Sequence, residues 1–361
     1  MKKVLIIIST SFVSYGGLAT VMMNYYTHMD LDNIQIDFAS NNTPDNKILE
    51  MLRGNSKYYN LGKRKNIFQY MHNLYKLVRK EQYDIVHLNG NSSTMVLELS
   101  VARFAGVKKR IAHVHNTRSG HPVLNKLLHP LFKKSYTDAI AVSKDAGDWL
   151  YGNNYIVLNN AIDTKKYAYN ESLRDSARKE LNIKDEFIIG NIGKLSSQKN
   201  QTFLLDVFAE YKKINKLSKL LIGGGGELES ELKSKAKKLG LINDVIFLGM
   251  LTEVEKYLQV FDCFVFTSIY EGLGMVLIEA QASGLKCITS SAVPIETKVT
   301  DNIDYLDLET SIDDWASAIE EIRLSHYDRC VLSTEAQISI KNNGYSINEE
   351  VNKLRNIYLS I

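Results

Sequence analysis

Short apolar runs alternate with amphipathic stretches along the first half of the chain. The runs have the length and composition of buried strands, and the stretches between them carry apolar residues at helical spacing. The predicted strands cover residues 4–9, 34–39, 85–88, 110–115 and 139–143, and the predicted helices cover residues 18–28, 67–80, 95–105 and 125–133. Strands separated by helices of about 10–15 residues are typical of βαβ units, so we expect a parallel sheet with helices on both faces.

The alternation pauses at residues 159–163 and in the polar stretch 165–176, and then begins again. The second set of predicted strands covers residues 187–192, 217–222, 245–248, 263–267 and 287–289, and the helices cover residues 202–214, 228–239, 276–283 and 312–324. Residues 347–358 have the amphipathic pattern of a last helix. The pattern predicts an α/β protein with two Rossmann-like parallel-sheet domains, residues 1–163 and 164–346, with a hinge near residues 160–172.

Ligands of open parallel sheets bind beyond the carboxyl ends of the strands. Two such sheets that face each other create a cleft between the domains, and clefts of this kind are preferred ligand sites. We therefore expect functional residues in the loops that follow predicted strands.

Residues 271–279, with the sequence EGLGMVLIE, form the most informative of these loops. Two carboxylates, Glu271 and Glu279, are separated by two glycines and an apolar run, directly after the strand-like residues 265–268. Glycines let backbone N–H groups approach a ligand closely, and a helix N-terminus favours a phosphate. Carboxylates accept hydrogen bonds from sugar hydroxyls. We expect a helix whose first turn carries Glu279, beside a charged, hydroxyl-rich ligand.

Residues 193–200, with the sequence GKLSSQKN, follow the first predicted strand of the second half. Two lysines five positions apart, Lys194 and Lys199, can clamp a diphosphate that faces the N-terminus of the next helix. Taken alone, this segment also fits a solvated loop. Its position at the same corner of the sheet as residues 271–279 favours the binding site.

The first half offers weaker candidates. Gly16 and Gly17 follow the first strand and precede a helix, which suits a phosphate but also fits a simple tight turn. The absence of a G-x-G-x-x-G motif disfavours a dinucleotide fold. His113 and His115 end a predicted strand and point to the same face, so they serve one site or make structural hydrogen bonds. His115 is the stronger candidate because it lies further toward the expected cleft, and a metal pair lacks a third ligand of suitable spacing.

Other motifs carry less information. Four consecutive glycines at residues 223–226 fit close approach by a ligand or by the other domain, or else a flexible connector. The pairs Asp30/Asp32 and Asp301/Asp304 resemble metal-binding motifs but are interpreted as surface turns, so no metal site is expected. Three cysteines without C-x-x-C spacing argue against a disulfide framework or a zinc site and fit a reducing cytoplasm.

Basic charge is concentrated in the first half. Residues 1–165 carry 21 Lys/Arg against 12 Asp/Glu, a net +9, whereas residues 166–361 carry 23 against 29, a net −6. The basic clusters at residues 63–65, 108–110 and 133–134 are either solvated surface or a face that docks on an anionic membrane or a lipid-linked pyrophosphate. Nucleic acid is not expected, because the clusters are short and carry no binding motif. No apolar run has the length of a membrane span, and the N-terminal run is too short for a signal peptide.

The order and spacing of these motifs resemble the retaining GT-B glycosyltransferases of family 4, which are widespread in bacterial polysaccharide synthesis. The resemblance covers essentially the whole chain and rests on Gly17, His115, the loop at 193–200 and the two glutamates, of which the last are the most specific. It implies a GT-B fold, with an N-terminal domain that binds the acceptor and a C-terminal domain that binds a nucleotide sugar. It also implies that the final helix, residues 347–361, packs back on the N-terminal domain.

The resemblance implies roles for individual residues. Glu271 would contact the donor sugar, Glu279 would bind the ribose of the nucleotide, and Lys194 and Lys199 would bind the diphosphate. The first lysine replaces an arginine that is common in the family, and it lacks the bidentate fork of arginine. The other implied donor-binding residues are Gly17, Gly193, Gly272, Leu273, Gly274 and Met275.

The implied reaction moves a hexose or N-acetylhexosamine from a nucleotide-diphosphate sugar, with UDP favoured, to a saccharide acceptor with retention. His115, Glu271 and Lys199 are the candidate catalytic residues. The lysines and the helix N-terminus would stabilise the leaving diphosphate, so no metal or other cofactor is expected. The acceptor is expected to be lipid-linked, and the protein cytoplasmic or peripheral on the inner face of the membrane. Two alternatives stay open: a UDP-sugar epimerase of the same fold, and a non-catalytic partner subunit of a transferase.

Overall fold

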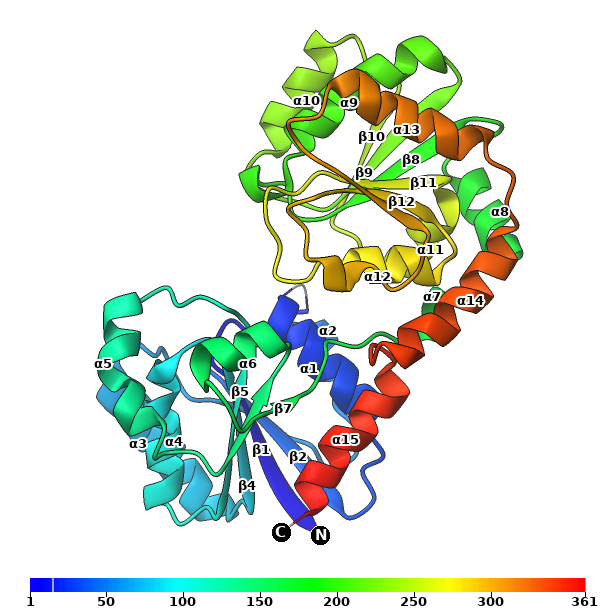
Figure 1. Cartoon of the computed structure of the whole chain (residues 1–361). Coiled ribbons are helices and arrows are strands. Elements are labelled where there is room, and N and C mark those ends of the chain that lie inside the picture. The colour runs from blue at the N-terminus through cyan, green and yellow to red at the C-terminus, as the bar shows by residue number, and fades with distance from the viewer. Residues whose placement is uncertain (15, 361) are drawn as a thin grey trace. The chain divides into compact units, whose positions relative to one another are not determined.

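The computed structural model describes residues 1–14 and 16–360, and the chain divides into two compact units. Unit 1 comprises Met1–Ile162 and Gly344–Ile361, and unit 2 comprises Asp163–Asn343. Each unit is an α/β fold in which helices cover both faces of one parallel sheet (Figure 1). The end of the expected segment 347–361, Ile361, lies outside the described residues.

Unit 1 is built on a seven-stranded parallel sheet with the order β3-β2-β1-β4-β5-β6-β7. Its strands are β1 (Lys2–Ile8), β2 (Ile34–Ser40), β3 (Tyr58–Asn60), β4 (Ile85–Gly90), β5 (Lys109–Val114), β6 (Asp138–Ala141) and β7 (Ile156–Val157). Its helices are α1 (Gly17–His28), α2 (Asn46–Glu50), α3 (Ile67–Glu81), η1 (Ser93–Met95), α4 (Val96–Phe104), α5 (Pro122–Phe132), α6 (Lys144–Leu150) and α15 (Ile347–Leu359).

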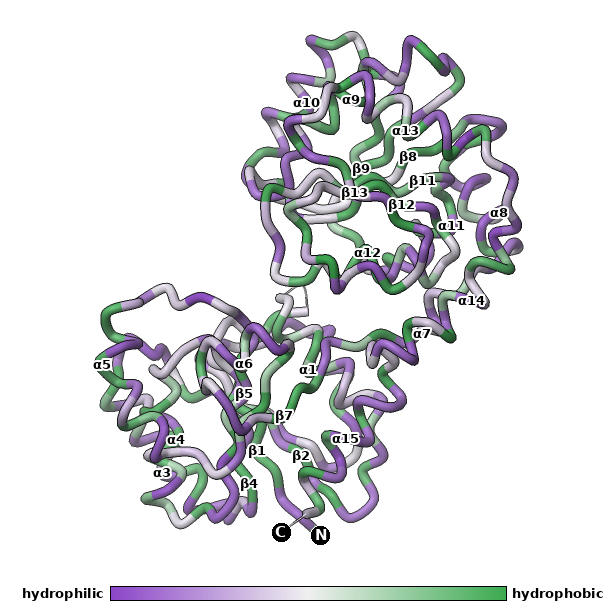
Figure 2. The backbone as a smooth tube through the Cα atoms, viewed as in Figure 1, coloured by the Kyte–Doolittle hydropathy of each residue, from purple (hydrophilic) through white to green (hydrophobic). Residues whose placement is uncertain are grey.

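Strand β1, in the interior of the unit 1 sheet, is apolar on both faces because both faces are covered. Val4 and Ile6 of β1 belong to one buried cluster with α1 and α15, while Leu5 and Ile7 belong to a second cluster with α3 and α4. Successive side chains of a strand point to opposite faces, so a continuous apolar run serves two cores at once. Figure 2 shows the same pattern, with mostly hydrophobic strands and helices that alternate between hydrophobic and hydrophilic segments.

Unit 2 is built on a six-stranded parallel sheet with the order β10-β9-β8-β11-β12-β13. Its strands are β8 (Phe187–Ile192), β9 (Ser218–Gly223), β10 (Val245–Gly249), β11 (Cys263–Phe266), β12 (Lys286–Ser290) and β13 (Ile303–Leu306). Its helices are α7 (Thr164–Tyr167), α8 (Glu171–Glu180), η2 (Ser197–Lys199), α9 (Gln201–Ile214), α10 (Glu229–Lys238), α11 (Val254–Val260), α12 (Met275–Ala282), η3 (Ile295–Thr297), α13 (Ile312–Leu324) and α14 (Arg329–Asn342).

The last helix of the chain returns to unit 1. Leu354 and Tyr358 of α15 are fully buried in the cluster formed with α1 and β1. Glu350 is also fully buried, and its carboxylate accepts a hydrogen bond from the backbone N–H of Asn159 at 3.0 Å. Arg355 forms an ion pair with Asp30 at 3.0 Å, so the turn after α1 is held by the C-terminal helix. The chain therefore completes unit 1 only after unit 2 has been synthesised.

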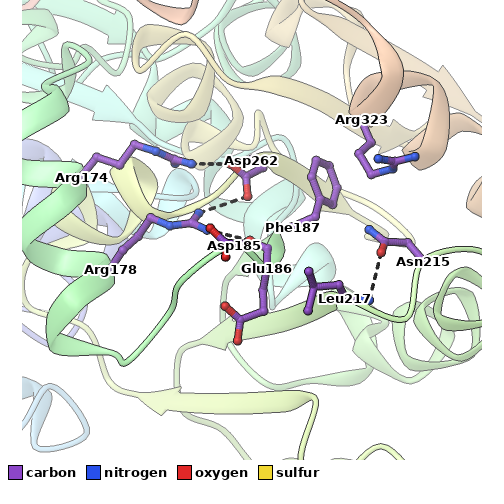
Figure 3. Close-up of a pocket in the computed structure, with 9 residues that line it drawn as sticks. All are labelled: Arg174, Arg178, Asp185, Glu186, Phe187, Asn215, Leu217, Asp262 and Arg323. Carbon is purple, nitrogen blue, oxygen red and sulfur yellow. Dashed lines mark hydrogen bonds and ion pairs between the residues drawn. The ribbon is translucent and has the colours of Figure 1, made fainter.

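The polar stretch at residues 165–176 begins just after the boundary between the two units, which falls inside the range 160–172 predicted for the hinge. It forms α7 and the first part of α8, and it belongs to unit 2. Asn170 caps α8 by accepting a hydrogen bond from the N–H of Leu173. Arg174 and Arg178 both pair with Asp262, beside a pocket of about 350 Å³ (Figure 3). These ion pairs add to the apolar packing of α8, whose Ala177 is buried in the core of unit 2.

Candidate functional site

Two loops at the carboxyl edge of the unit 2 sheet are held together by hydrogen bonds. One loop follows β8 and the other follows β11. The N–H of Ile269 donates to the carbonyl of Gln198 at 2.8 Å, and the Gln198 amide donates to the carbonyl of Tyr270 at 3.0 Å. The hydroxyl of Thr267 donates to the carbonyl of Asn200 at 3.0 Å. The two motifs that the sequence singled out in this half are thus neighbours in the folded unit.

Lys199 and Glu271 form a close and largely buried ion pair at this edge. The Lys199 Nζ lies 2.5 Å from Oε1 of Glu271, and the two side chains are only 17% and 7% exposed. The same ammonium lies 4.7 Å from the centre of the Phe266 ring, a cation–π arrangement. A Cβ placed on Gly193 would lie 3.4 Å from Cε of Lys199, so the lysine stem crosses directly over this glycine. The pair presents one cation that is already neutralised by a carboxylate.

Lys194 is differently placed. Its Nζ pairs with Glu227 at 2.9 Å, and the two side chains are 65% and 57% exposed. An exposed pair of this kind contributes little to stability and exchanges partners readily. The two lysines of the loop therefore have separate carboxylate partners, one buried and one in solvent.

The turn before α12 has a backbone that requires glycine. Gly274 has φ +87° and occupies the N-cap position of α12, where it offers no side chain to accept from the first N–H groups of the helix. The hydroxyl of Thr297 donates to the carbonyl of Leu273 and holds the turn from the other side. Met275 is the first residue of α12, and Gly272 is exposed with no atom within 4 Å of a Cβ placed on it. This helix N-terminus is suited to an anion that supplies the missing acceptors.

Glu279 lies in the second turn of α12, not in the first turn as predicted, because the helix begins at Met275. Its Oε1 accepts a hydrogen bond from the hydroxyl of Tyr167 at 3.1 Å. Burial raises the pKa of Glu279 from 4.5 to about 7, because desolvation penalises the ionised form more than the Tyr167 hydrogen bond favours it. This carboxyl therefore changes charge near neutral pH. Tyr167 was missed because it lies in the stretch that was predicted to be a hinge.

The glycine run at 223–226 serves the packing of loops within unit 2. A Cβ on Gly224 would lie 1.9 Å from the carbonyl oxygen of Gly193, and one on Gly226 would lie 2.2 Å from that of Leu195. The N–H of Leu195 donates to the carbonyl of Gly225 at 3.0 Å. These close contacts, rather than flexibility, account for the glycine run. It lets the loop after β9 press against the backbone of the loop that carries Lys194 and Lys199.

In unit 1, His115 follows β5 and belongs to a buried polar network. Its Nε2 lies 2.9 Å from Oδ1 of Asn89, so the imidazole donates there and Nδ1 is the acceptor nitrogen. Burial lowers the pKa of His115 to about 3, which keeps the ring neutral. The ring of His113 lies 4.1 Å from that of His115, centre to centre, and burial also lowers its pKa. Neither histidine carries charge near neutral pH.

The network continues to the C-terminal helix through His87, which the sequence analysis did not single out. His87 Nε2 lies 3.2 Å from Nδ1 of His113, and His87 Nδ1 lies 2.6 Å from the hydroxyl of Tyr358. His87 lies between the buried apolar residues Val86 and Leu88 of β4, and a polar residue in such a run was the available signal. Gly17, the remaining candidate of this unit, opens α1 and is exposed.

Metal-ligating side chains do not gather in the part of the chain that the structure describes. Residues 1–14 and 16–360 contain no group of three or more His, Cys, Asp or Glu side chains placed to hold a metal ion. Cys263, Cys287 and Cys330 are free thiols, and the first two are buried. Among the same residues, no helix combines the length and the apolar character needed to cross a bilayer.

Comparison with known families and proteins gives matches along both units. The family model for glycosyl transferases group 1 matches residues 174–337, and the model for glycosyltransferase family 4 matches residues 15–166. The chain is 31% identical to the putative glycosyltransferase EpsF of Bacillus subtilis (strain 168), over 99% of this chain and 96% of that protein. It is 29% identical to the UDP-Gal:alpha-D-GlcNAc-diphosphoundecaprenol alpha-1,3-galactosyltransferase of Escherichia coli, over 80% of this chain and 78% of that enzyme.

Solved structures share the fold at low sequence identity. Anabaena HepE in complex with UDP and glucose superposes with a TM-score of 0.80 at 17% identity, over 99% of each chain. WaaG, a glycosyltransferase involved in lipopolysaccharide biosynthesis, superposes with a TM-score of 0.73 at 12% identity, over 97% of this chain and 99% of that one. At these identities the likeness concerns the fold alone.

Proposed function

Since this chain belongs to the family 4 glycosyltransferases of GT-B fold, we propose that it transfers a hexose or N-acetylhexosamine from a UDP-sugar to a saccharide acceptor, with retention. The observation that carries the proposal is the buried pair of Lys199 and Glu271 beside the N-terminus of α12. A cation, a carboxylate and unfilled backbone donors at one sheet edge suit a ligand that combines phosphate with hydroxyl groups.

The donor is proposed to lie across the two loops of unit 2. Its diphosphate would be bound by Lys199, by Lys194 and by the N–H groups at the start of α12, with the backbone of Gly193 and residues 272–275 close by. Its ribose would bind Glu279, and its sugar would contact Glu271. Related structures supply the support for uridine, because HepE is described in complexes with UDP and with UDP-glucose.

Departure of the UDP builds negative charge on the β-phosphate, and stabilising that charge is the main work left to the protein. The bond from C1 of the sugar to the phosphate oxygen breaks, and the acceptor oxygen forms the new bond to C1 on the same face. The acceptor proton passes to the leaving phosphate, so neither a protein base nor a nucleophile is needed. Lys199 and the helix N-terminus take the role that a divalent metal has in other sugar transferases.

His115 is proposed to orient a sugar hydroxyl, of the donor or of the acceptor. Because Nε2 of His115 donates its hydrogen to Asn89, Nδ1 is the acceptor nitrogen and can accept a hydrogen bond from a sugar hydroxyl. The neutral ring adds no charge to the site. Gly17, at the start of α1, is proposed to let a ligand approach the backbone closely.

The acceptor is proposed to be lipid-linked, with the protein at the cytoplasmic face of a membrane and a role in surface polysaccharide synthesis. The names of three relatives support this proposal. The E. coli relative and one of Campylobacter jejuni act on undecaprenol-diphosphate sugars, and CapH of Staphylococcus aureus is a capsular polysaccharide biosynthesis glycosyltransferase. The positive charge of residues 1–165 supports it independently.

The test combines purified protein, a panel of UDP-, GDP- and ADP-sugars, lipid-linked saccharides and EDTA. We expect transfer from a UDP-sugar that survives EDTA and retains the anomeric configuration, as read by NMR of the product. Lys199→Met and Glu271→Gln should each lower turnover at least about 100-fold, the usual loss when a transition-state contact is removed. Glu271→Gln should leave UDP binding intact or tighter, because it frees Lys199 from its carboxylate.

The matched control is Lys235→Met, which breaks another lysine–carboxylate pair of unit 2, with Asp206 at 2.6 Å. It should leave transfer unchanged. Strict dependence on Mg²⁺ or Mn²⁺ would argue against the proposal, as would near-normal turnover in both site variants. Consumption of the UDP-sugar to an isomer without any acceptor would point instead to an epimerase.

A further inference from the structure

Helix α5 exposes an apolar stripe to solvent. Val123, Leu127 and Leu131 follow one another at intervals of four residues and are 81%, 72% and 62% exposed. Leu124, on the same side, is 43% exposed. Residues four apart lie on one face of a helix, so these side chains form a continuous surface along the whole length of α5. An exposed stripe of this kind marks an interaction surface rather than scattered surface residues.

The opposite face of α5 is firmly attached to unit 1, so the stripe cannot simply turn inward. Asn125 Oδ1 accepts a hydrogen bond from the N–H of Ser93 at 2.7 Å, and His129 Nδ1 lies 3.1 Å from the hydroxyl of the same serine. Phe132 is fully buried and packs against the rings of Tyr136 and Tyr151. In Figure 1, α5 forms the outer edge of unit 1 on the side away from α15.

The surroundings of the stripe are basic. From residue 99 to residue 137 the sequence contains no Asp or Glu, and its Lys and Arg residues in this interval are Arg103, Lys108, Lys109, Arg110, Arg118, Lys126, Lys133 and Lys134. Lys126 of α5 and Lys133, its C-cap residue, are exposed and lie seven residues apart on the flank of the stripe. At the C-terminal end, Arg103 donates to the carbonyl of Lys134 at 3.2 Å, which brings α4 and its 82% exposed Phe104 to the same end of α5.

We propose that α5 docks in the interface of a bilayer that contains anionic lipids. The apolar stripe of Val123, Leu124, Leu127 and Leu131 would enter the acyl boundary, while Lys126 and Lys133 would stay at the headgroups, as in an interfacial amphipathic helix. Lysines at the edge favour lipid over a protein partner, because protein interfaces are depleted in lysine and favour aromatic residues. A second copy of this chain would also have to pair two faces of like charge.

The location of α5 connects this surface to the chemistry, and here the inference rests on the proposed function. Only residues 115–121 separate β5 from the first residue of α5, and His115 is the first of them. The N-terminal end of α5 therefore lies at the same end of β5 as His115, and the helix runs back toward the amino end of the strand, where Arg110 Nε donates to the carbonyl of Ser135 at 2.8 Å. An acceptor that is anchored by its lipid would reach unit 1 from the surface to which α5 is bound.

Flotation of the full chain with vesicles tests the proposal. We expect binding to phosphatidylglycerol/phosphatidylcholine vesicles at low salt, little binding to phosphatidylcholine alone, and weaker binding in 0.5 M NaCl. Leu127→Asn with Leu131→Asn should weaken binding about tenfold or more, because the apolar contact is removed without added charge. Lys126→Gln with Lys133→Gln should weaken it by roughly fivefold per charge and should flatten the dependence on salt.

The matched control is Val331→Asn with Ile338→Asn, on helix α14 of unit 2, where the two side chains are 50% and 60% exposed. It should bind vesicles like the unchanged chain. Unchanged binding by the α5 leucine variant would overturn the proposal, as would failure of the unchanged chain to bind anionic vesicles. A dimer that dissociates in the leucine variant, without vesicle binding, would assign the stripe to a second copy and also overturn it.

A separate readout distinguishes this inference from the proposed function. With a water-soluble saccharide acceptor, the leucine variant should keep the turnover of the unchanged chain. If no variant transfers sugar but vesicle binding still depends on Leu127 and Leu131, the proposed reaction fails and the docking surface stands. If transfer proceeds but vesicle binding does not depend on Leu127 and Leu131, the docking surface fails and the proposed reaction stands.

Discussion

The residues of the candidate site differ in what holds them in place. Lys199 is fixed by three local features: the carboxylate of Glu271, the face of Phe266, and the open backbone of Gly193 beneath its stem. Lys194 has only a solvent-exposed partner. A side chain that is fixed before the ligand arrives loses less entropy on binding. We therefore expect Lys199 to contribute more than Lys194 to binding of the diphosphate.

Glu279 is predicted to make donor binding depend on pH. Its pKa is about 7, and the ionised carboxylate accepts a stronger, charge-assisted hydrogen bond from a ribose hydroxyl than the protonated carboxyl does. UDP-glucose, whose phosphates do not titrate in this range, should bind up to about tenfold more tightly at pH 8 than at pH 6, as the ionised fraction rises. Calorimetry should show this increase in the unchanged chain and not in Glu279→Gln; equal pH dependence in both would contradict the ribose assignment.

The carboxyl of Glu279 is also predicted to make the unliganded protein less stable as the pH rises, whereas donor binding becomes tighter. The folded pKa of about 7 lies above the ordinary 4.5, so the folded state binds the proton more tightly than the unfolded state. The resulting stabilisation is complete below about pH 4.5 and is lost as the pH rises through about 7. The side chain of Glu279→Gln stays neutral at every pH. Without ligand, the Tm of this variant at pH 8 should exceed that of the unchanged chain by roughly 2–4 °C. This is the shift that about 1 kcal/mol produces in a unit of this size. At pH 4 the two Tm values should converge.

At the scale of elements, loops rather than helices and strands decide the shape of the unit 2 site. The loop after β9 packs on the loop after β8 through backbone alone, because Gly224 and Gly226 leave no side chain between them. The loop after β11 is joined to the same β8 loop by Gln198, Ile269 and Tyr270. The position of Lys199 therefore depends on two neighbouring loops as well as on its own.

Gly224→Ala should disturb this arrangement strongly. Gly224 has φ +130°, and a Cβ there would lie 1.9 Å from a backbone oxygen, so the loops must separate. We expect a loss of about 1–3 kcal/mol in the free energy of unfolding of unit 2, together with weaker donor binding. Urea denaturation can follow this unit through Trp315, which is fully buried in α13, after Trp149→Phe removes the only other tryptophan.

Gly272→Ala is the matched control for stability. A Cβ on Gly272 meets no atom within 4 Å, and its φ is not positive. Its free energy of unfolding should stay within about 0.5 kcal/mol of the unchanged chain. Similar losses in both variants would mean that the glycine run is not a packing device.

At the scale of the whole molecule, the residues of unit 2 are inserted in the sequence of unit 1. Unit 1 takes its last helix from residues that follow unit 2. Tyr358 of that helix reaches His87 in the sheet of unit 1, so the C-terminal helix is also part of the polar network that ends at His115. Unit 1 is therefore discontinuous in the sequence, and contacts between its two segments complete it.

Leu354→Ala tests whether α15 stabilises unit 1 specifically. Leu354 is fully buried against α1 and β1, so its truncation should cost about 2–5 kcal/mol in unit 1. With Trp315→Phe, the remaining Trp149 of α6 reports this loss, whereas with Trp149→Phe, Trp315 should report an unchanged midpoint for unit 2. Ile340→Ala in α14 is the converse control, because Ile340 is fully buried in unit 2. An equal shift at both tryptophans for Leu354→Ala would contradict the assignment.

The sequence by itself determined the class of fold and most of its long elements. Runs such as residues 4–9 and 187–192 are buried on both faces, and such strands read as continuous apolar segments wherever they occur. The edge strands β3, β7 and β13 were missed, because two to four residues at a sheet edge carry too short a pattern. The proximity of the loops that carry Lys199 and Glu271 was also predicted from the sequence, because the carboxyl ends of parallel strands share one edge of a sheet.

Only the tertiary structure decided the partners of these residues. The role of the glycine run, the burial of Glu279 beside Tyr167, and the link from Tyr358 through His87 toward His115 all join segments that are remote in the chain. The same holds for Arg174 and Arg178 of α8, which both pair with Asp262. Local sequence patterns show the periodicity of an element and the face that it buries. Desolvation of a side chain and close backbone contacts depend on segments that are distant in the sequence, so only the tertiary structure shows them.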